Sequence, residues 1–341
     1  MKVNVKTANK EYEILISKLP EIEIEGKVAI ITNPKVAGLH INYLTNHLKA
    51  QEIHIITLPD GEEYKNIDSI NYAFDRLFDA KFDRNSTLIA FGGGVIGDMT
   101  GFVASIFLRG IKFLQIPTTL LATVDSSVGG KTGINNKYGK NLIGSFYQPE
   151  AVFIDTHFLS TLEKREFAAG MAEVIKMAIM FDKEFFENLK NHTLSLEEII
   201  KRSVEIKADI VNQDEKEKGI RSVLNYGHTF AHVIENETNY KQYLHGEAVA
   251  IGMVMANELS KELGFLTKAE AEDIKKTLKE CNLPTDYKIK DINSFYEHFF
   301  LDKKTTDNKI KFIIPNHIGE YKIVKNIDKE IILNVLRKFI K

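Results

Sequence analysis

Short apolar runs alternate with stretches of helical periodicity over the first 155 residues of the chain. Five runs rich in Val, Ile and Phe predict strands at residues 28–32, 53–58, 87–91, 113–116 and 151–154. Between the first three runs, two segments carry apolar side chains at spacings of three and four, which predicts core-facing helices at residues 37–50 and 67–80. Alternation of this kind favours a mostly parallel sheet covered by helices, so we expect an α/β domain over residues 1–155.

The pattern changes after residue 156. Long periodic segments predict helices at residues 196–211, 246–263 and 268–281, and strand signals become rare. Gly264 and Pro284 follow the second and third segments closely, as residues that end helices usually do. The 341 residues also exceed the roughly 250 to 300 at which a single core stops growing. We therefore expect a second, mainly α-helical domain over residues 156–341.

Charge and composition limit the partners and the compartment. The 45 basic and 47 acidic residues give a formal net charge of -2, which offers no electrostatic case for a nucleic-acid or membrane partner. Apolar runs stay well short of the ~20 residues that a membrane span needs. Residues 1–10 are too polar for the core of a secretory signal, and the single Cys281 excludes an internal disulfide. These features predict a soluble cytoplasmic protein.

A glycine-rich string, GGGVIGD at residues 92–98, follows the predicted strand 87–91 directly and precedes a predicted helix. Glycines at this place let backbone N–H groups approach a pyrophosphate at the positive end of a helix. The spacing is that of the G-x-G-x-x-G form of dinucleotide sites. Two features differ from that fingerprint: the string is not in the first βα turn, and no acidic residue follows about 20 positions later. A plain tight turn therefore stays open as the alternative.

The polar stretch 117–141 is a second candidate for binding phosphate. It is rich in hydroxyl side chains and glycines and contains Lys131 and Lys140, so it could surround phosphate oxygens with backbone and cationic groups. Its GGKT string resembles the end of a P-loop, but Asp125 stands where the first glycine of that motif belongs. ATP hydrolysis is therefore not indicated. The alternative is a surface loop with solvated lysines.

Four side chains are candidates for a metal site: Glu173, His228, His232 and His245. His228 and His232 are four residues apart, so on a helix they share one face. Catalytic zinc commonly takes three nitrogen or oxygen ligands from the protein. The H-E-x-x-H motif of metalloproteases is absent, because Thr229 follows His228. Structural histidines are the alternative, which the pairing of His228 with His232 makes less favoured.

Cations are scattered through the second half of the chain. Several of them converging on one site would suit a small polyanion such as a phosphorylated sugar acid. Solvated surface positions are the alternative for each. The candidates are Lys176, Lys207, Arg221, Lys303 and Lys304.

With these motifs the chain resembles the 3-dehydroquinate synthases, a family of sugar-phosphate cyclases, from about residue 60 to about residue 304. The resemblance is carried by the strings at residues 92–98, 117–141, 170–176, 224–232 and 245–247. It implies a Rossmann-like N-terminal domain that binds NAD, a helical C-terminal domain that binds a divalent metal, and a homodimer.

The resemblance also implies roles for particular residues. The implied metal ligands are Glu173, His228 and His245, with zinc or cobalt as the ion, while His232 serves the elimination of phosphate. The implied NAD contacts are Asp60, Glu63, Lys65, Gly94, Val95, Ile96, Gly97, Asp98, Thr118, Thr119, Lys131, Lys140, Phe158, Leu159, Ser160 and Thr161. The implied substrate contacts are Arg109, Asp125, Lys131, Asn141, Lys176, Lys207, Arg221, Asn225 and one of Lys303 and Lys304.

The substrate implied is 3-deoxy-D-arabino-heptulosonate 7-phosphate, a small sugar phosphate. Transient oxidation by NAD, loss of phosphate, reduction, ring opening and aldol closure would give 3-dehydroquinate in the shikimate pathway. Two alternatives are another sugar-phosphate cyclase, such as a 2-deoxy-scyllo-inosose or 2-epi-5-epi-valiolone synthase, and a metal-dependent polyol dehydrogenase. A noncatalytic metabolite sensor is a third. Arg221 favours the first prediction, because a guanidinium suits the carboxylate of the heptulosonate.

Overall fold

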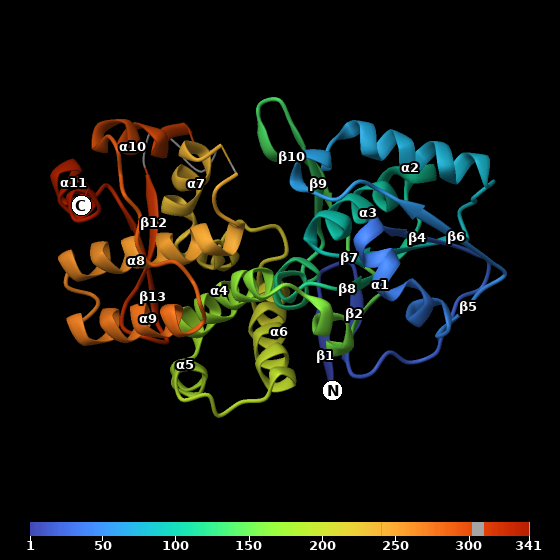
Figure 1. Ribbon diagram of the computed structural model, residues 1–341, viewed down its shortest axis with the longest axis horizontal. Helices are drawn as coiled ribbons and strands as arrows, with labels where there is room; N and C mark the ends of the chain where they lie inside the picture. Colours follow the sequence, from blue (N-terminus) through green and yellow to red (C-terminus); the bar gives the residue numbers. More distant parts are fainter. Residues whose placement is uncertain (240, 302–309, 341) are drawn as a thin grey trace. The chain divides into compact units, whose positions relative to one another are not determined.

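The computed structural model describes residues 1–239, 241–301 and 310–340, and these residues form two compact units. Unit 1 comprises Met1–Glu163 and Lys207–Lys216, and unit 2 comprises Lys164–Ile206 and Glu217–Lys341. Figure 1 shows the elements of both units in the colours of the sequence. Lys303 and Lys304 lie outside the described residues. None of the described helices has both the length and the apolar character needed to cross a membrane.

A seven-stranded sheet forms the centre of unit 1. Its strands follow the order β1-β2-β11-β8-β7-β4-β6, and every neighbouring pair is parallel except β1 and β2. All five predicted strands are confirmed. The strands are β1 (Lys2–Lys6), β2 (Glu11–Ile16), β4 (Lys27–Thr32), β6 (Glu52–Thr57), β7 (Thr87–Gly92), β8 (Lys112–Pro117) and β11 (Ala151–Ile154).

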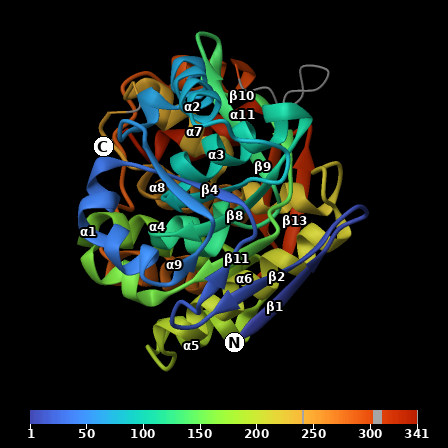
Figure 2. The same cartoon turned by 90° about the vertical axis from the view of Figure 1, so that its right-hand side faces the viewer.

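The hairpin of β1 and β2, which Figure 2 shows clearly, was not predicted. Its side chains alternate between buried and exposed positions, as in a strand with one solvated face. The alternation was therefore visible in the sequence of both strands.

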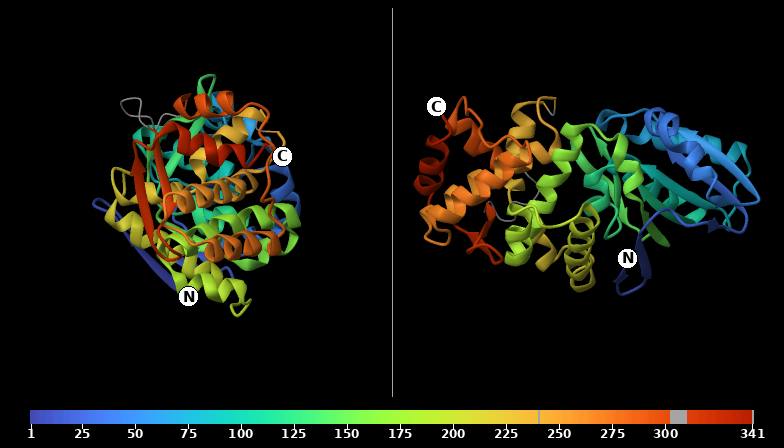
Figure 3. Two further views of the ribbon diagram at one scale, coloured as in Figure 1. Left: turned by 90° about the vertical axis from the view of Figure 1, so that its left-hand side faces the viewer. Right: turned by 60° about the horizontal axis from the view of Figure 1, so that its bottom comes forward.

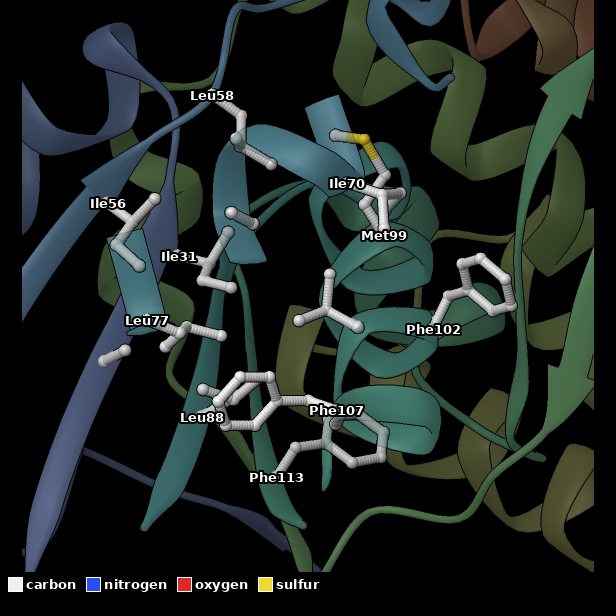
Figure 4. Close-up of a cluster of buried hydrophobic side chains, with 14 of the residues drawn as sticks. Ile31, Ile56, Leu58, Ile70, Leu77, Leu88, Met99, Phe102, Phe107 and Phe113 are labelled. Carbon is white, nitrogen blue, oxygen red and sulfur yellow. The ribbon is translucent and has the colours of Figure 1, made fainter. Parts of the chain in front are cut away.

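Three helices cover this sheet: α1 (Pro34–Thr45), α2 (Ile67–Asp79) and α3 (Gly94–Ile106). Figure 4 shows how Ile31 and Leu88 of the sheet pack with Leu77 of α2 and Met99 of α3 in one buried cluster. The prediction of a helix over residues 37–50 was wrong at both ends. Asn33 caps α1 at its start, and the chain leaves the helix at residue 45 so that β5 (Leu48–Lys49) pairs with β3 (Ile22–Glu23).

The polar stretch 117–141 contains regular structure. A single π-helical turn, η3 (Ala122–Ser126), is followed by a hairpin of β9 (Lys131–Asn136) and β10 (Gly139–Phe146). Thr118, Thr123 and Ser127 are buried, so the alternative of a solvated surface loop is wrong for the first part of the stretch. Short 3-10 turns complete unit 1 at η1 (Glu62–Tyr64), η2 (Phe107–Arg109) and η4 (Thr156–Thr161).

Unit 2 is mainly helical, as predicted, and the left panel of Figure 3 shows its helices with the hairpin β12–β13 in red. Helix α8 is buried along most of its length and contacts α4, α7, α9 and α11. The predicted helices at 196–211, 246–263 and 268–281 are confirmed within two residues, whereas the hairpin was not predicted. The elements are α4 (Lys164–Phe181), α5 (Lys183–Lys190), α6 (Leu196–Gln213), η5 (Ile220–Asn225), α7 (His228–Glu237), α8 (His245–Glu262), α9 (Lys268–Glu280), α10 (Ile292–His298), η6 (Phe299–Leu301), β12 (Lys311–Pro315), β13 (Tyr321–Lys325) and α11 (Lys329–Arg337).

Candidate active site

Three side chains of unit 2 bring metal-ligand atoms together. Glu173 lies in the middle of α4, while His228 and His245 are the first residues of α7 and α8. One ligand atom from each lies within 4.8 Å of the others, and Glu173 Oε1 is 3.8 Å from His228 Nε2 and 3.9 Å from His245 Nε2. We call these three residues the metal cluster.

The chemistry of the metal cluster fits a divalent cation. Glu173 is 1% exposed, and its Oε1 has no hydrogen-bond partner among the described residues. A buried carboxylate oxygen without a partner is costly, and a bound cation would remove that cost. Two imidazole nitrogens and one carboxylate oxygen form a donor set typical of catalytic zinc, which leaves a further position for substrate. The other oxygen, Oε2, is bonded to the ammonium of Lys176.

Two glycines of α8 let the three ligand-bearing helices approach one another closely. A Cβ added at Gly246 would lie 1.9 Å from the carbonyl oxygen of Ala169 in α4. A Cβ added at Gly252 would lie 2.2 Å from the carbonyl oxygen of Gly227, which directly precedes His228. Neither distance is possible for a real side chain. The sequence therefore places glycine where α8 touches α4 and α7, and this contact brings the ligands into range.

Hydrogen bonds orient both histidines of the metal cluster. His228 Nδ1 lies 3.1 Å from the carbonyl oxygen of Tyr226, and His245 Nδ1 lies 3.2 Å from Glu235 Oε1. Both partners are acceptors, so Nδ1 carries the proton in each ring and Nε2 keeps its lone pair for a metal. Glu235 was not predicted from the sequence. Its spacing of seven residues from His228 on one helix face could have indicated it.

His232 is near the metal cluster without belonging to it. Its ring is 5.8 Å from the ring of His228, at nearly a right angle, one turn further along α7. Among the described residues, the set of ligand atoms that lie together does not include His232. Of the four metal-ligand candidates predicted from the sequence, three thus have the geometry of a metal site. The role of His232 in phosphate elimination stays a prediction.

Two buried cations accompany the metal cluster in unit 2. Lys176 is 2% exposed and Arg221 is 1% exposed, which rejects the alternative of solvated surface positions for both. Arg221 lies in η5, the short turn that leads into α7. Asn225 ends the same turn, and its amide donates to Glu217 Oε1 at 2.6 Å.

In unit 1 the glycine-rich string forms a tight junction between β7 and α3. Gly93 is the N-cap of α3, and no side chain caps the helix there. A Cβ added at Gly93 would meet Thr119 Cγ2 at 3.1 Å, and one added at Gly94 would meet Ser126 Oγ at 3.0 Å. The N–H groups of a helix start, at the carboxyl end of a parallel strand, are the usual place for a diphosphate in an open α/β sheet. The remaining members of the string, Val95, Ile96 and Gly97, form the first turn of α3.

Lys65, Asp98 and Asn141 meet beside this junction. Lys65 Nζ lies 2.5 Å from Asp98 Oδ2 and 2.5 Å from Asn141 Oδ1. Burial alone would lower the pKa of Lys65, but the negative charges of Asp98 and Glu62 outweigh it and raise that pKa. The lysine therefore stays charged, and it joins two residues that are far apart in the sequence, Asp98 and Asn141.

Asp60 and Glu63 are exposed beyond the end of β6. The amide of Asn33, a residue that was not among the predicted contacts, donates to Asp60 Oδ1 at 2.9 Å. Asn33 also caps α1 by accepting from the N–H of Val36. An asparagine between a strand and a proline is a common start of a helix, so this signal was available in the sequence.

The other residues of unit 1 that were predicted to contact NAD or substrate differ in their burial and in their partners. Lys207 is bonded to the carboxylate of Asp125 at 2.6 Å, and Asp125 lies in the π-turn η3, a kind of turn often found at functional sites. Phe158 is 1% exposed and packs on Phe91 in the core, so only its backbone remains for a cofactor. Leu159 is also buried. The exposed or half-buried members are Arg109, Thr119, Lys131, Lys140, Ser160 and Thr161.

Comparisons with solved structures define the class of the chain. A 2-epi-5-epi-valiolone synthase from Streptomyces hygroscopicus subsp. jinggangensis 5008 with bound NAD+ and Zn2+ is 26% identical, with a TM-score of 0.87 over 96% of both chains. A 2-deoxy-scyllo-inosose synthase complexed with carbaglucose-6-phosphate, NAD+ and Co2+ is 25% identical, with a TM-score of 0.86 over 99% of this chain and 100% of that chain. The fold and the site thus assign the chain to the sugar-phosphate cyclase class.

Sequence comparisons define the family within that class. The family models "3-dehydroquinate synthase N-terminal" and "3-dehydroquinate synthase C-terminal" match residues 55–169 and 170–305. A 3-dehydroquinate synthase of Sulfurovum sp. (strain NBC37-1) is 62% identical over 337 residues, which cover 98% of this chain and 96% of the relative. The chain belongs to the 3-dehydroquinate synthase family. The predicted resemblance is confirmed, and the chain is an enzyme of the phosphate lyase and cyclase type.

Proposed function

We propose that the chain converts 3-deoxy-D-arabino-heptulosonate 7-phosphate into 3-dehydroquinate and phosphate, with a divalent metal and NAD as cofactors. The observation that carries the proposal is the metal cluster. Its carboxylate oxygen Glu173 Oε1, without a hydrogen-bond partner among the described residues, lies 3.8 Å from His228 Nε2 and 3.9 Å from His245 Nε2. Family membership supports the substrate, because relatives that are 53% to 62% identical over nearly the whole chain are 3-dehydroquinate synthases. The other cyclase alternatives rest on 25% to 26% identity and are less favoured.

Glu173, His228 and His245 would hold the metal, which is zinc or cobalt by analogy with the two solved cyclases. A divalent ion at this place would lower the pKa of a coordinated substrate hydroxyl and so prepare it for oxidation. His232, one turn from His228 on α7, would assist the departure of phosphate from its place beside the metal cluster.

Unit 1 would bind NAD at the carboxyl ends of its parallel strands. The uncapped start of α3 would receive the diphosphate, with the remaining contacts near Asp60, Thr118, Thr119 and the turn η4. Held by these residues, the nicotinamide of NAD would supply a reversible hydride acceptor for the substrate. Lys65 supports this junction by joining Asp98 to Asn141. The negative charges of Asp98 and Glu62 raise its pKa and keep it charged.

The substrate carries a carboxylate and a phosphate, and the chain has cations that suit both groups. Buried Arg221 suits the carboxylate because a guanidinium can donate two parallel hydrogen bonds to it. Lys176, bonded to Glu173, would lie next to the metal-bound end of the substrate. In unit 1, Arg109, Lys131 and Asn141 are the proposed phosphate contacts, and Lys207 with Asp125 forms a further charged pair.

We also propose that the chain acts as a homodimer in the cytoplasm and that its functional domains are residues 1–155 and 156–341. The dimer is supported by the resemblance to the family, and the compartment by the single cysteine. Light scattering coupled to gel filtration would test the dimer directly: a mass of twice 38.7 kDa is expected.

The decisive experiment supplies the purified, zinc-loaded enzyme with heptulosonate 7-phosphate and an amount of NAD far below that of the substrate. Released phosphate and carbocyclic product are followed together, and His228→Ala is the control. We expect several turnovers for each NAD, lost in the control, because the hydride returns to the product. Accumulation of NADH without phosphate release would instead favour a polyol dehydrogenase.

A further inference from the structure

The two histidines of the metal cluster are held by different kinds of acceptor. His228 bonds to a backbone carbonyl oxygen, that of Tyr226, which no side-chain substitution removes. His245 bonds to the side chain of Glu235. The ring of His245 is also the more exposed of the two, with 39% of its side chain accessible against 11% for His228. A less enclosed ring is fixed less by packing, so it depends more on its hydrogen bond.

Glu235 is well placed to hold this ring. Its side chain is only 5% exposed, so it is a carboxylate kept inside the protein, where an unpaired charge would be costly. It lies in α7, two turns after His228, while His245 begins the next helix. Helix α7 therefore carries one metal ligand at its start and the hydrogen-bond partner of another ligand further along.

We propose that Glu235 is a positioning residue for the metal. By accepting the Nδ1–H of His245 it fixes the tautomer and the orientation of the ring, and it makes Nε2 a better donor. This inference rests on the proposed function, because it presupposes a metal at Glu173, His228 and His245. Removal of such a partner typically costs 10-fold to 100-fold in metal affinity.

The test measures zinc affinity by competition with a chromogenic chelator, without substrate. Glu235→Ala is expected to weaken zinc binding about 10-fold to 100-fold. Glu235→Gln keeps the size and one acceptor oxygen but loses the charge, so we expect a smaller loss. Glu237→Gln is the matched control, because Glu237 also accepts a part-buried hydrogen bond on the same helix, from the hydroxyl of Tyr287 at 2.8 Å. Its zinc affinity should equal that of the unmodified protein.

The visible absorption of the cobalt-loaded protein gives a second readout, since it reports the geometry around the ion. We expect a changed spectrum in both Glu235 variants and an unchanged one in Glu237→Gln. Unchanged affinity and spectrum in the Glu235 variants would overturn this inference alone, provided that His228→Ala loses the metal. If His228→Ala also keeps the metal, the proposed metal site itself is wrong.

A third measurement needs no substitution at Glu235 and so does not depend on how those variants fold. In zinc-loaded protein with 15N-labelled histidines, the signals of His245 are identified by their loss in His245→Gln. We expect a protonated Nδ1 and a metal-bound Nε2. Metal bound at Nδ1 would contradict the proposal, because that nitrogen would then be unable to donate to Glu235.

Discussion

Lys65 and Asp98 form a nearly buried ion pair, and their side chains are 4% and 21% exposed. Asp98→Asn would leave the ammonium of Lys65 inside the protein without its opposite charge, so we expect the free energy of unfolding to fall by about 3 kcal/mol. The same change should lower the pKa of Lys65, because the attraction that raises this pKa is removed. Urea unfolding without NAD would measure the effect separately from any role in cofactor binding.

The double variant Lys65→Met with Asp98→Asn is the control for this interpretation. It removes both charges, so a good part of the lost stability should return. If the single and double variants unfold at the same urea concentration, the cost does not come from an uncompensated charge, and the pair contributes little to the fold.

At the residue scale, the sequence indicated those site residues that can be recognised by residue type and spacing. His228 and His232 were candidates because they are four residues apart, and the glycines at 92–97 because they follow a strand. The contacts of Glu235 with His245 and of Asn33 with Asp60 were missed because each partner lies in another element. The local signals, such as the helix start at Asn33, do not reveal these partners. A glutamate in a helix is usually a solvated residue, and only its burial shows otherwise.

Among the elements, the close contact of α7 with α8 is the most sensitive to substitution. Gly252→Ala would place a Cβ 2.2 Å from the carbonyl oxygen of Gly227, so one helix must move. Because His228 follows Gly227, this movement should displace a metal ligand. We expect a loss of about 3 kcal/mol in the free energy of unfolding and at least a 10-fold loss in zinc affinity, measured by thermal denaturation and chelator competition.

Gly38→Ala is the matched control for this prediction. Gly38 also lies in a helix, α1, but a Cβ added there meets no atom within 4 Å. Alanine favours a helix over glycine by up to about 1 kcal/mol, so this variant should be as stable as the unmodified protein or slightly more stable. Equal behaviour of the two variants would contradict the role of close helix packing.

Glu270 at the start of α9 makes a pH-dependent contribution to stability. Burial alone would raise its pKa, but hydrogen bonds from Thr267, His317 and Ile318 lower it to about 2. Since this pKa is below the unfolded value of about 4.3, the stabilisation is present at neutral pH and is lost as the pH falls from about 4.3 towards 2. Glu270→Gln should therefore cost about 1 to 2 kcal/mol at pH 7, and the difference should narrow between pH 4.5 and pH 3.

Thermal denaturation of both proteins over this pH range would measure the narrowing. Glu272→Gln, on the same helix with a side chain that is 68% exposed, should give no such dependence. A difference for Glu270→Gln that stays constant from pH 7 to pH 3 would show that the shape of the side chain matters and its charge does not.

Regular elements with strong periodicity were predicted correctly, and short or locally specified ones were not. The buried strands of unit 1 are continuous apolar runs. Helices α2, α8 and α9 begin and end near capping or stop residues. Both kinds of element can therefore be predicted from a single sequence. The hairpin β9–β10 was missed because its strands consist of glycine, asparagine and lysine to a large extent. Their pairing depends on packing of β9 against α3, which a single sequence does not reveal.

At the scale of the whole molecule, the chain passes between the two units more than once. Residues 207–216 belong to unit 1 although they follow a segment of unit 2, so Lys207 is grouped with Asp125. A prediction that divides the chain at one point does not produce this grouping. The periodicity of apolar residues indicates where a helix lies, but it does not indicate to which unit the end of that helix belongs. The metal cluster, in contrast, lies entirely within unit 2, and its three proposed ligands come from three helices that begin or run close together.

The assignment of one cofactor to each unit leads to a prediction for the complete protein. A ligand stabilises the folded segments that bind it, by about 2.7 kcal/mol when its concentration is 100 times its Kd. Zinc without NAD should therefore slow amide hydrogen exchange in α4, α7 and α8, and NAD without zinc should slow it around residues 92–98 and 117–126. Mass spectrometry of peptides from the exchanged protein would locate both effects.

In His228→Ala the zinc effect should vanish while the NAD effect persists, because only the metal cluster has lost a ligand. If zinc instead protects the glycine-rich string, or NAD protects only the three metal-bearing helices, the division of the two cofactors between the units is wrong.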